Sequence, residues 1–509
     1  MSFFRPSLSK LGLVRNVFLT VAIGLLFLIA NWSVPAVPDT GSPFLVRPYV
    51  QIGDSPQNLP KEQIFIFWHA PPNLDGWAVE YREKSNAAWR TASDLHSETI
   101  SVLTIAAHSM WSAVLPDLTP GAEVEYRILL QGTTVFEAST RARKTLRQAT
   151  RFVVVGDVGT DSTGTREVAF QIYRNNPDFI VIPGDIAYSR GTISDYRAKF
   201  YPYWNADSAS PSKGAPILRS IPVYAGLGEH DTSYLWYMIP PENKEALYDE
   251  FANLNAYPDS LAYFLYWRFP LNGPVRSTSS SNSYQLRGEP RVVDEFLRAS
   301  KPRFPVMANY SFEYGETHWA ILDTWNPSAD WNSAELRRWL DTHLASTGSQ
   351  WRFAAIYSPP FHSYRGPAWQ KMRAVADLLE KQNVTIAFSG CWHSYQWTAP
   401  LRFRVSDKAR RQPANGIRTA IDGQFLLDEK FDGKTETKPD GVIYMVTGAG
   451  GAPLLGAEQT NNPSTWQSFT RRYIADRYSF TVVDVAADVL ELRQISNTGE
   501  IIDSLKISR

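Results

Sequence analysis

Candidate metal-binding side chains follow glycine at the ends of four apolar segments of this 509-residue chain. The segments cover residues 152–155, 179–182, 222–227 and 385–388, and each has the length of a buried β-strand. Ligand sites of open α/β sheets lie beyond the carboxyl ends of the strands, so we expect the residues after these segments to meet at one site. These residues are Gly156-Asp157, Gly184-Asp185, Gly228-Glu229-His230-Asp231 and Gly390-Cys391-Trp392-His393.

The elements that must position these residues alternate between strands and helices after residue 151. Apolar residues recur at helical spacing over residues 165–173, 334–344 and 368–382. Short apolar runs, typical of strands, lie between them, and an alternating tail starts at Tyr478 and is expected to pair at a sheet edge. This order predicts a layered α/β fold with buried strands. The further strand-like runs cover residues 310–315, 318–323, 353–357 and 442–446.

A small all-β module is expected before this region, over residues 48–147. Residues 64–68 form an apolar run, residues 77–82 alternate apolar and polar side chains, and residues 118–121 read Leu-Thr-Pro-Gly. Short strands separated by turns are typical of a β-sandwich. The turn and the Tyr126-Arg127 step that follows it resemble a fibronectin type III module. We expect this module to act as a spacer or a partial wall.

The ordered series of strand-end residues resembles the signature of the calcineurin-like metallophosphoesterases. The position of Tyr188, three residues after Asp185, resembles the motif of the purple acid phosphatases in particular. The preceding sandwich and residues 447–453 resemble the same family. The resemblance covers about residues 48–509 and implies a metallophosphoesterase β-sandwich flanked by helices. It also implies a phosphoester hydrolase, in which two metal ions about 3.5–4 Å apart hold the attacking and leaving oxygens.

The resemblance implies one complete iron site. Asp157 stands at the position of the first aspartate ligand, Asp185 at that of the bridging aspartate, and His393 at that of the second histidine of the Gly-His-x-His block. Tyr188 matches the tyrosinate that colours the iron(III) centre of that family.

The second metal site differs from the family pattern. Glu229 replaces an asparagine ligand, and Tyr357 and Cys391 each replace a histidine. Two interpretations stay open. Either the second divalent metal (zinc, manganese or iron) is lost, or these three residues form a replacement site, since each can bind a metal when deprotonated.

Several histidines are candidates for other roles. His230 matches the histidine that contacts phosphate in the family, which implies a hydrogen-bond donor or general acid, and it is our catalytic candidate. His318, between strand residues, is expected in the core. His362, with Tyr364 and Arg365, lies in a loop that could reach the cleft.

The first 37 residues predict export. Arg5, Lys10 and Arg15 precede an apolar run from residue 17 to residue 30, as in a signal peptide or a signal anchor. Both alternatives place the rest of the chain outside the cytoplasm, either anchored to a membrane and facing its non-cytoplasmic side, or secreted or periplasmic. Residues 38–47, rich in proline, glycine and small polar residues, are expected to be a linker.

Charge and composition limit the partners. Lys plus Arg and Asp plus Glu both number 51, so the net charge gives no support to a nucleic-acid partner. Cys391 is the one cysteine, which excludes an intramolecular disulfide. An aromatic-rich insertion over residues 232–308 is expected either to cap the cleft, to bind a protein partner or the membrane, or to form a small core of its own.

Three functions follow as hypotheses. The first is a metal-dependent phosphoester hydrolase acting on a phosphorylated small molecule or a phosphoprotein. The second is a catalytically inactive relative that serves as a membrane-tethered binding or assembly module. The third is a different hydrolase or metal-binding protein with a remodelled second site.

Overall fold

The computed structural model describes residues 41–103, 105–232, 253–366, 369–416 and 419–509. Residues 43–509 pack as one unit. The predicted signal segment over residues 1–37 and the first three residues of the predicted linker, 38–40, lie outside the described residues. Within the described chain, no helix is both long enough and apolar enough to cross a membrane.

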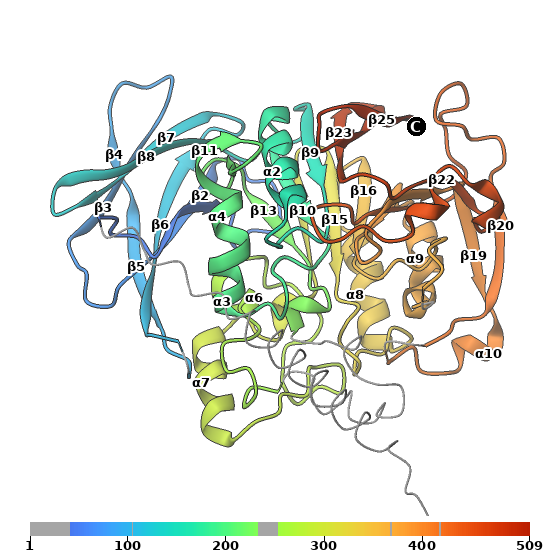
Figure 1. Ribbon diagram of the computed structural model, residues 1–509, viewed down its shortest axis with the longest axis horizontal. Coiled ribbons are helices and arrows are strands. Elements are labelled where there is room, and N and C mark those ends of the chain that lie inside the picture. Colours follow the sequence, from blue (N-terminus) through green and yellow to red (C-terminus); the bar gives the residue numbers. More distant parts are fainter. Residues whose placement is uncertain (1–40, 104, 233–252, 367–368, 417–418) are drawn as a thin grey trace, which may run out of the picture. The chain divides into compact units, whose positions relative to one another are not determined.

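The N-terminal module is a β-sandwich of two antiparallel sheets with four strands each (Figure 1). Its core is formed by alternate residues such as Ile64, Ile66 and Trp68, which point away from the rest of the chain. The prediction of a β-sandwich is confirmed, whereas its likeness to fibronectin type III stays a prediction. One sheet contains, in spatial order, β1 (Val46–Gln51), β2 (Glu62–Ala70), β6 (His108–Leu118) and β5 (Ser93–Ile100), and the other β4 (Arg90–Thr91), β3 (Trp77–Glu83), β7 (Glu123–Leu130) and β8 (Thr133–Arg141).

Two larger sheets form the layers that carry the strand-end residues. Strands β9, β10 and β13 run parallel in the first, and β15, β16, β17 and β21 run parallel in the second. The spatial order in the first sheet is β13 (Val223–Ala225), β10 (Phe179–Ile182), β9 (Thr150–Val154), β23 (Ser479–Ala486), β24 (Val489–Ser496) and β25 (Ile501–Ser508). The order in the second sheet is β14 (Tyr310–Tyr314), β15 (Thr317–Leu322), β16 (Trp351–Ile356), β17 (Ile386–Ser389), β21 (Ile443–Thr447), β18 (Tyr395–Thr398) and β22 (Thr470–Ile474).

The two large sheets pack face to face through aromatic side chains. The ring of Phe152 in the first sheet lies 5.1 Å from that of Trp319 and 5.3 Å from that of Phe353 in the second, measured between centroids. Edge-to-face aromatic pairs of this kind stabilise a core beyond the area they bury. The predicted layered α/β fold is therefore confirmed, and the tail after Tyr478 extends the first sheet as β23, β24 and β25.

Helices flank the sheets, with α2 (Thr163–Asn175) beside the first and α8 (Ala334–Ala345) beside the second (Figure 1). Both begin at a serine N-cap, Ser162 and Ser333, whose hydroxyl accepts a backbone N–H of the first turn. The helix expected over residues 368–382 is wrong as one element. A 3₁₀ turn (Lys371–Val375) precedes α9 (Ala376–Lys381), because Val375 has φ −107° and ψ 3°, outside the α-helical range.

Shorter elements complete the chain. They are the helices α3 (Ile193–Asp195), α4 (Tyr201–Trp204), α6 (Tyr263–Tyr266), α7 (Pro290–Ser300) and α10 (Asp407–Arg410), the π-helical turn Tyr196–Phe200, the 3₁₀ turns His230–Thr232, Val306–Ala308, Ala457–Gln459 and Pro463–Thr465, and the strands β11 (Asn205–Ser210), β12 (Gly214–Pro216), β19 (Leu401–Val405) and β20 (Gly423–Leu427).

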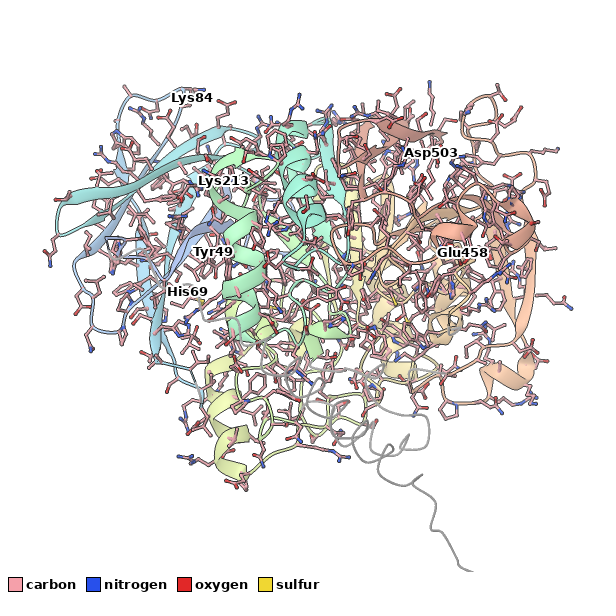
Figure 2. All side chains as sticks on the ribbon, viewed as in Figure 1. Tyr49, His69, Lys84, Lys213, Glu458 and Asp503 are labelled. Atoms are coloured by element: carbon pink, nitrogen blue, oxygen red, sulfur yellow. The ribbon has the colours of Figure 1, made fainter. Side chains whose placement is uncertain are left out.

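The second face of the sheet β1–β2–β6–β5 packs against the body of the chain, which is the part after residue 150. Figure 2 labels Tyr49 and His69 on this sheet, and their ring centroids lie 5.7 Å and 6.1 Å from that of Tyr201 at the start of α4. The hydroxyl of Tyr49 donates to the carbonyl of Tyr266 at 3.0 Å. The module is thus joined to the body by a buried polar and aromatic contact.

The described part of the aromatic insertion is built into this contact. Tyr263, Tyr266 and Trp267 are at most 1% exposed. These three side chains are therefore covered by the chain itself, as in the alternative in which the insertion forms a core of its own, while the cap and partner alternatives stay predictions for the insertion. Residues 233–252 of the insertion lie outside the described residues.

Candidate metal centre

Two aspartates stand just after the ends of neighbouring parallel strands. Asp157 follows β9 and has φ 62°, and Asp185 follows β10 and has φ 57°. This left-handed conformation is uncommon for residues other than glycine and turns each chain sharply at the sheet edge. Glycine at position 228 allows a third loop to approach, because a Cβ atom there would lie 2.1 Å from Oδ1 of Asp185.

Asp157, Tyr188 and His393 present their polar atoms to one another. The Tyr188 oxygen lies 3.1 Å from Oδ1 of Asp157 and 3.4 Å from Nε2 of His393, and that nitrogen lies 3.5 Å from the same Asp157 oxygen. Nδ1 of His393 lies 2.6 Å from the carbonyl oxygen of Pro453, which accepts its hydrogen. The Nε2 lone pair is then directed toward Asp157 and Tyr188.

This donor set fits a metal ion. Ligand atoms about 2.1 Å from a metal are separated from one another by about 3–3.5 Å, which matches the distances between these three side chains. Asp185 joins the set through Tyr357, whose hydroxyl is hydrogen-bonded to both aspartates. Carboxylate and imidazole donors suit several metals, iron and zinc among them.

Tyr357 and Cys391, predicted at the second site, contact the same aspartates. The Tyr357 hydroxyl donates to Oδ1 of Asp157 at 3.0 Å and also to Oδ2 of Asp185. The backbone N–H of Cys391, which has φ 71°, donates to Oδ2 of Asp157 at 3.0 Å. Burial and then the charge of Asp157 raise the pKa of Tyr357 well above 10. Burial and then Glu229 likewise raise the pKa of the Cys391 thiol. Without a cation, both side chains therefore keep their protons.

Glu229 and His230 form the second part of the cluster. Nε2 of His230 lies 3.5 Å from Oε1 of Glu229 and 3.8 Å from Oδ2 of Asp185. One ligand atom from each of these three residues falls within 4.8 Å of the others, a grouping that could hold a metal ion. The ring of His230 lies 4.0 Å from that of Tyr188, so the proposed phosphate-contacting histidine touches the candidate metal site directly.

Asp231 is a residue of this centre that the sequence reasoning did not assign. Its carboxylate accepts the backbone N–H of Asp185 at 2.8 Å, of Gly228 at 2.9 Å and of Ile186 at 3.1 Å. It therefore ties the loop after β10 to the loop after β13 and holds Asp185 in its left-handed conformation. The signal for it was its place at a strand end beside His230, in the same motif as the predicted ligands.

The loop containing His362 lies against Trp392 of the Gly390–His393 segment. The ring centroids of His362 and Tyr364 are 5.3 Å and 4.6 Å from that of Trp392. Burial lowers the pKa of His362 to about 4. His318 is buried on β15, 3.8 Å from Glu313, as expected of a core histidine.

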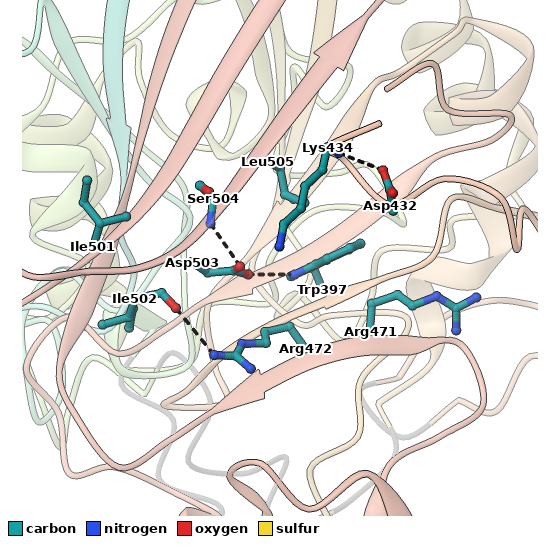
Figure 3. A pocket seen from close by; sticks show the side chains of 10 residues that line it. All are labelled: Trp397, Asp432, Lys434, Arg471, Arg472, Ile501, Ile502, Asp503, Ser504 and Leu505. Carbon is teal, nitrogen blue, oxygen red and sulfur yellow. Dashed lines mark hydrogen bonds between the residues drawn. The ribbon is translucent and has the colours of Figure 1, made fainter. Parts of the chain in front are cut away.

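Figure 3 shows a polar pocket of about 450 Å³ at another place in the structure. It is lined by Trp397, Asp503 and three basic side chains, Lys434, Arg471 and Arg472. None of the predicted metal ligands in the described chain is among its lining residues. It is therefore not the candidate metal centre.

Comparisons with known proteins agree with the strand-end pattern. Residues 150–395 match the family model of the calcineurin-like phosphoesterases. The chain carries a calcineurin-like phosphoesterase domain. This domain holds all the residues that we assign to the metal centre, from Asp157 to His393, and the resemblance to the calcineurin-like family is confirmed.

Solved structures show the same fold. The purple acid phosphatase PPD1 from yellow lupin (Lupinus luteus) seeds is 17% identical, with a TM-score of 0.61 over 91% of this chain and 74% of that chain. The structure of PhoD is 14% identical, with a TM-score of 0.54 over 92% of this chain and 94% of that chain. No curated protein sequence matches the chain. The two structures extend the likeness in fold from the calcineurin-like phosphoesterase domain to nearly the whole chain.

Proposed function

We propose that this protein is a metal-dependent phosphoester hydrolase of purple acid phosphatase type, with one iron site and an altered second site. Asp157, Asp185, Tyr188 and His393 would hold the iron. The observation that carries the proposal is the convergence of these four side chains from three strand-end loops, with ligand-atom separations among Asp157, Tyr188 and His393 that suit a metal.

The bound metal would polarise a phosphoryl oxygen and supply positive charge to the transition state. The chain's own residues would prepare the site for it. Pro453 fixes the tautomer of His393, and Asp231 fixes the loop of Asp185. Nδ1 of His230 lies 2.5 Å from the carbonyl oxygen of Ser189, which accepts its hydrogen, so Nε2 would donate a hydrogen bond to a phosphate oxygen only when the ring carries a second proton.

Hydrolysis of an aryl phosphate by the iron-loaded full chain tests the proposal. We expect Asp157→Asn to reduce the rate constant by about 100-fold or more, since it removes a ligand and its charge. Asp178→Asn is the matched control, because Asp178 is also buried but stands at the opposite end of β10. Equal rates for the wild type and Asp157→Asn would contradict the proposal.

A non-catalytic binding or assembly module is the second candidate. The observation that favours it is the Tyr357 hydroxyl, whose single hydrogen is shared between Asp157 and Asp185 where a second cation would supply positive charge. The triple change Glu229→Asn, Tyr357→His and Cys391→His distinguishes the hydrolase from the non-catalytic module. A large gain in phosphatase rate, together with a second bound metal, would indicate that the wild type lacks a working second site.

The remaining parts of the proposal concern location and partners. We propose that residues 1–37 export the chain, as a membrane anchor or a cleaved signal, and that the sandwich is a fibronectin type III-like spacer. The substrate would be a phosphorylated small molecule or a phosphoprotein. The basic residues before the apolar run support the first part, and fractionation of cells that express the full chain tests it.

A further inference from the structure

A second cavity lies between the β-sandwich module and the body, and no role has been assigned to it. It encloses about 480 Å³, within the range of pockets that bind small organic molecules. Apolar side chains of the module, Phe65, Phe67 and Met110, line one side, and Phe269 and Leu271 of the body line the other. The rings of Phe65 and Phe67 stack with an interplanar angle of 15°, so the module side of the cavity has an aromatic wall.

Two arginines lie at this cavity and share one carboxylate. Arg303 donates to Oε1 of Glu98 at 3.0 Å, and Arg268 is hydrogen-bonded to Oε2 of the same side chain. The three side chains are between 4% and 24% exposed, so water compensates their charges only in part. Lys301 and Asp54, which also line the cavity, add one positive and one negative charge, so the lining keeps an excess of one positive charge.

The guanidinium of Arg268 is fixed before any ligand arrives. It donates to the carbonyl oxygens of Leu265 at 3.2 Å and Trp267 at 3.1 Å, and it lies 5.6 Å from the ring centre of Phe67. Burial, and then the charge of Arg303, lower the pKa of Arg268 to about 10 even though Glu98 acts in the opposite direction. The excess positive charge is therefore unfavourable, and a second anion beside the two arginines would relieve it.

We propose that this cavity binds an organic anion with an apolar body and a single carboxylate or phosphate head. The head would pair with Arg268 beside Glu98, because the N–H groups of Arg303 already donate to Glu98 and to the carbonyl oxygens of Phe264, Ala299 and Lys301. The apolar body would lie along the wall formed by Phe65 and Phe67. Because both sides of the cavity contribute, the ligand would also stabilise the contact between the module and the body.

Isothermal titration calorimetry of the full chain with four probes tests the proposal, with chelator present so that inorganic phosphate and decyl phosphate, a phosphoester, do not bind at the metal centre. Decanoate and decyl phosphate carry both features, decanol lacks the charge, and inorganic phosphate lacks the apolar body. We expect the two amphipathic anions to bind at least about tenfold more tightly than the other probes. Comparison of decanoate with decyl phosphate identifies the preferred head. Equal binding of inorganic phosphate, or no binding of either amphipathic anion, would overturn the proposal.

Three variants locate the site. Arg268→Gln should weaken binding of the preferred anion by about 10- to 100-fold, whereas Glu98→Gln should tighten it by removing the competing carboxylate. Ser112→Phe should block the cavity, and Ser97→Phe, on the neighbouring strand but outside the lining, is its matched control. Thermal unfolding checks that each variant is folded. Unchanged binding in folded Ser112→Phe would overturn the proposal even if Arg268→Gln does not fold.

Discussion

The hydroxyl of Tyr357 donates a 3.0 Å hydrogen bond to the carboxylate of Asp157, at the place where the resemblance to purple acid phosphatases leads one to expect a histidine ligand. The same hydroxyl is bonded to Asp185. Two buried carboxylates side by side repel each other, and the shared phenol proton reduces that repulsion. Tyr357 therefore supports the aspartates of the first site and replaces part of the charge that a second metal would bring.

Tyr357→Phe should destabilise the metal-free protein more than the iron-loaded protein. Loss of the shared hydroxyl removes one hydrogen-bond donor from both carboxylates, which should lower the free energy of unfolding by about 1–3 kcal/mol. Bound iron would compensate for most of this loss. Urea unfolding with chelator and with iron measures the difference. Tyr126→Phe is the control, since it removes a 2.8 Å bond from a buried phenol to the carbonyl of Arg219, outside the site. The same loss in both states for Tyr357→Phe would contradict this role.

Asp231→Asn should weaken iron binding by about 10- to 100-fold without removing a ligand. The asparagine keeps one acceptor oxygen, but its NH₂ group would face backbone N–H groups whose hydrogen bonds the carboxylate accepts in the wild type. Competition with a coloured chelator measures the affinity. Asp259→Asn serves as a control, because Asp259 caps Ser194 through similar bonds. An unchanged iron affinity in folded Asp231→Asn would show that the hydrogen bonds of the Asp231 carboxylate do not position Asp185.

The stability of the protein should fall on acidification because of two histidines at the contact between the module and the body. Burial lowers the pKa of His108 to about 3 and that of His69 well below 6.5. The unfolded chain takes up these protons near pH 6.5, whereas the folded chain does not, so the free energy of unfolding decreases as pH falls from about 6.5 toward about 3. Between pH 7 and pH 5, His108 alone should contribute about 2 kcal/mol of this loss.

Replacement of both histidines by glutamine should flatten this pH dependence. Glutamine at position 108 can still accept the hydroxyl of Tyr266, which lies 3.1 Å from Nε2 of His108. His96→Gln is the matched control, because His96 is exposed on β5. Urea unfolding across this pH range provides the measurement. A pH dependence that survives the double change undiminished would assign the acid sensitivity to other groups.

The sequence predicted the ligand loops and the layered fold because those signals are local. A short apolar run followed by Gly-Asp places a carboxylate at a strand end whatever the rest of the chain does, as at Asp157 and Asp185. The bond from Tyr357 to these aspartates depends on the packing of three separate strands, and no local pattern encodes it. The same holds for Tyr263, Tyr266 and Trp267. Their abundance left open both a binding surface and a core of their own, and their burial follows from long-range contacts such as the bonds from the Tyr263 hydroxyl to the carbonyl oxygens of Ala225 and Met307.

Iron content and the visible absorption spectrum of the purified full chain test the central claim most directly. We predict about one iron per chain and a visible tyrosinate band that disappears in Tyr188→Phe, because the Tyr188 oxygen lies among the other candidate ligands. Tyr364→Phe, at a nearby phenol that stacks on Trp392, should leave the band unchanged. A chain that binds no iron after reconstitution, or a band that persists in Tyr188→Phe, would contradict the assignment of this site.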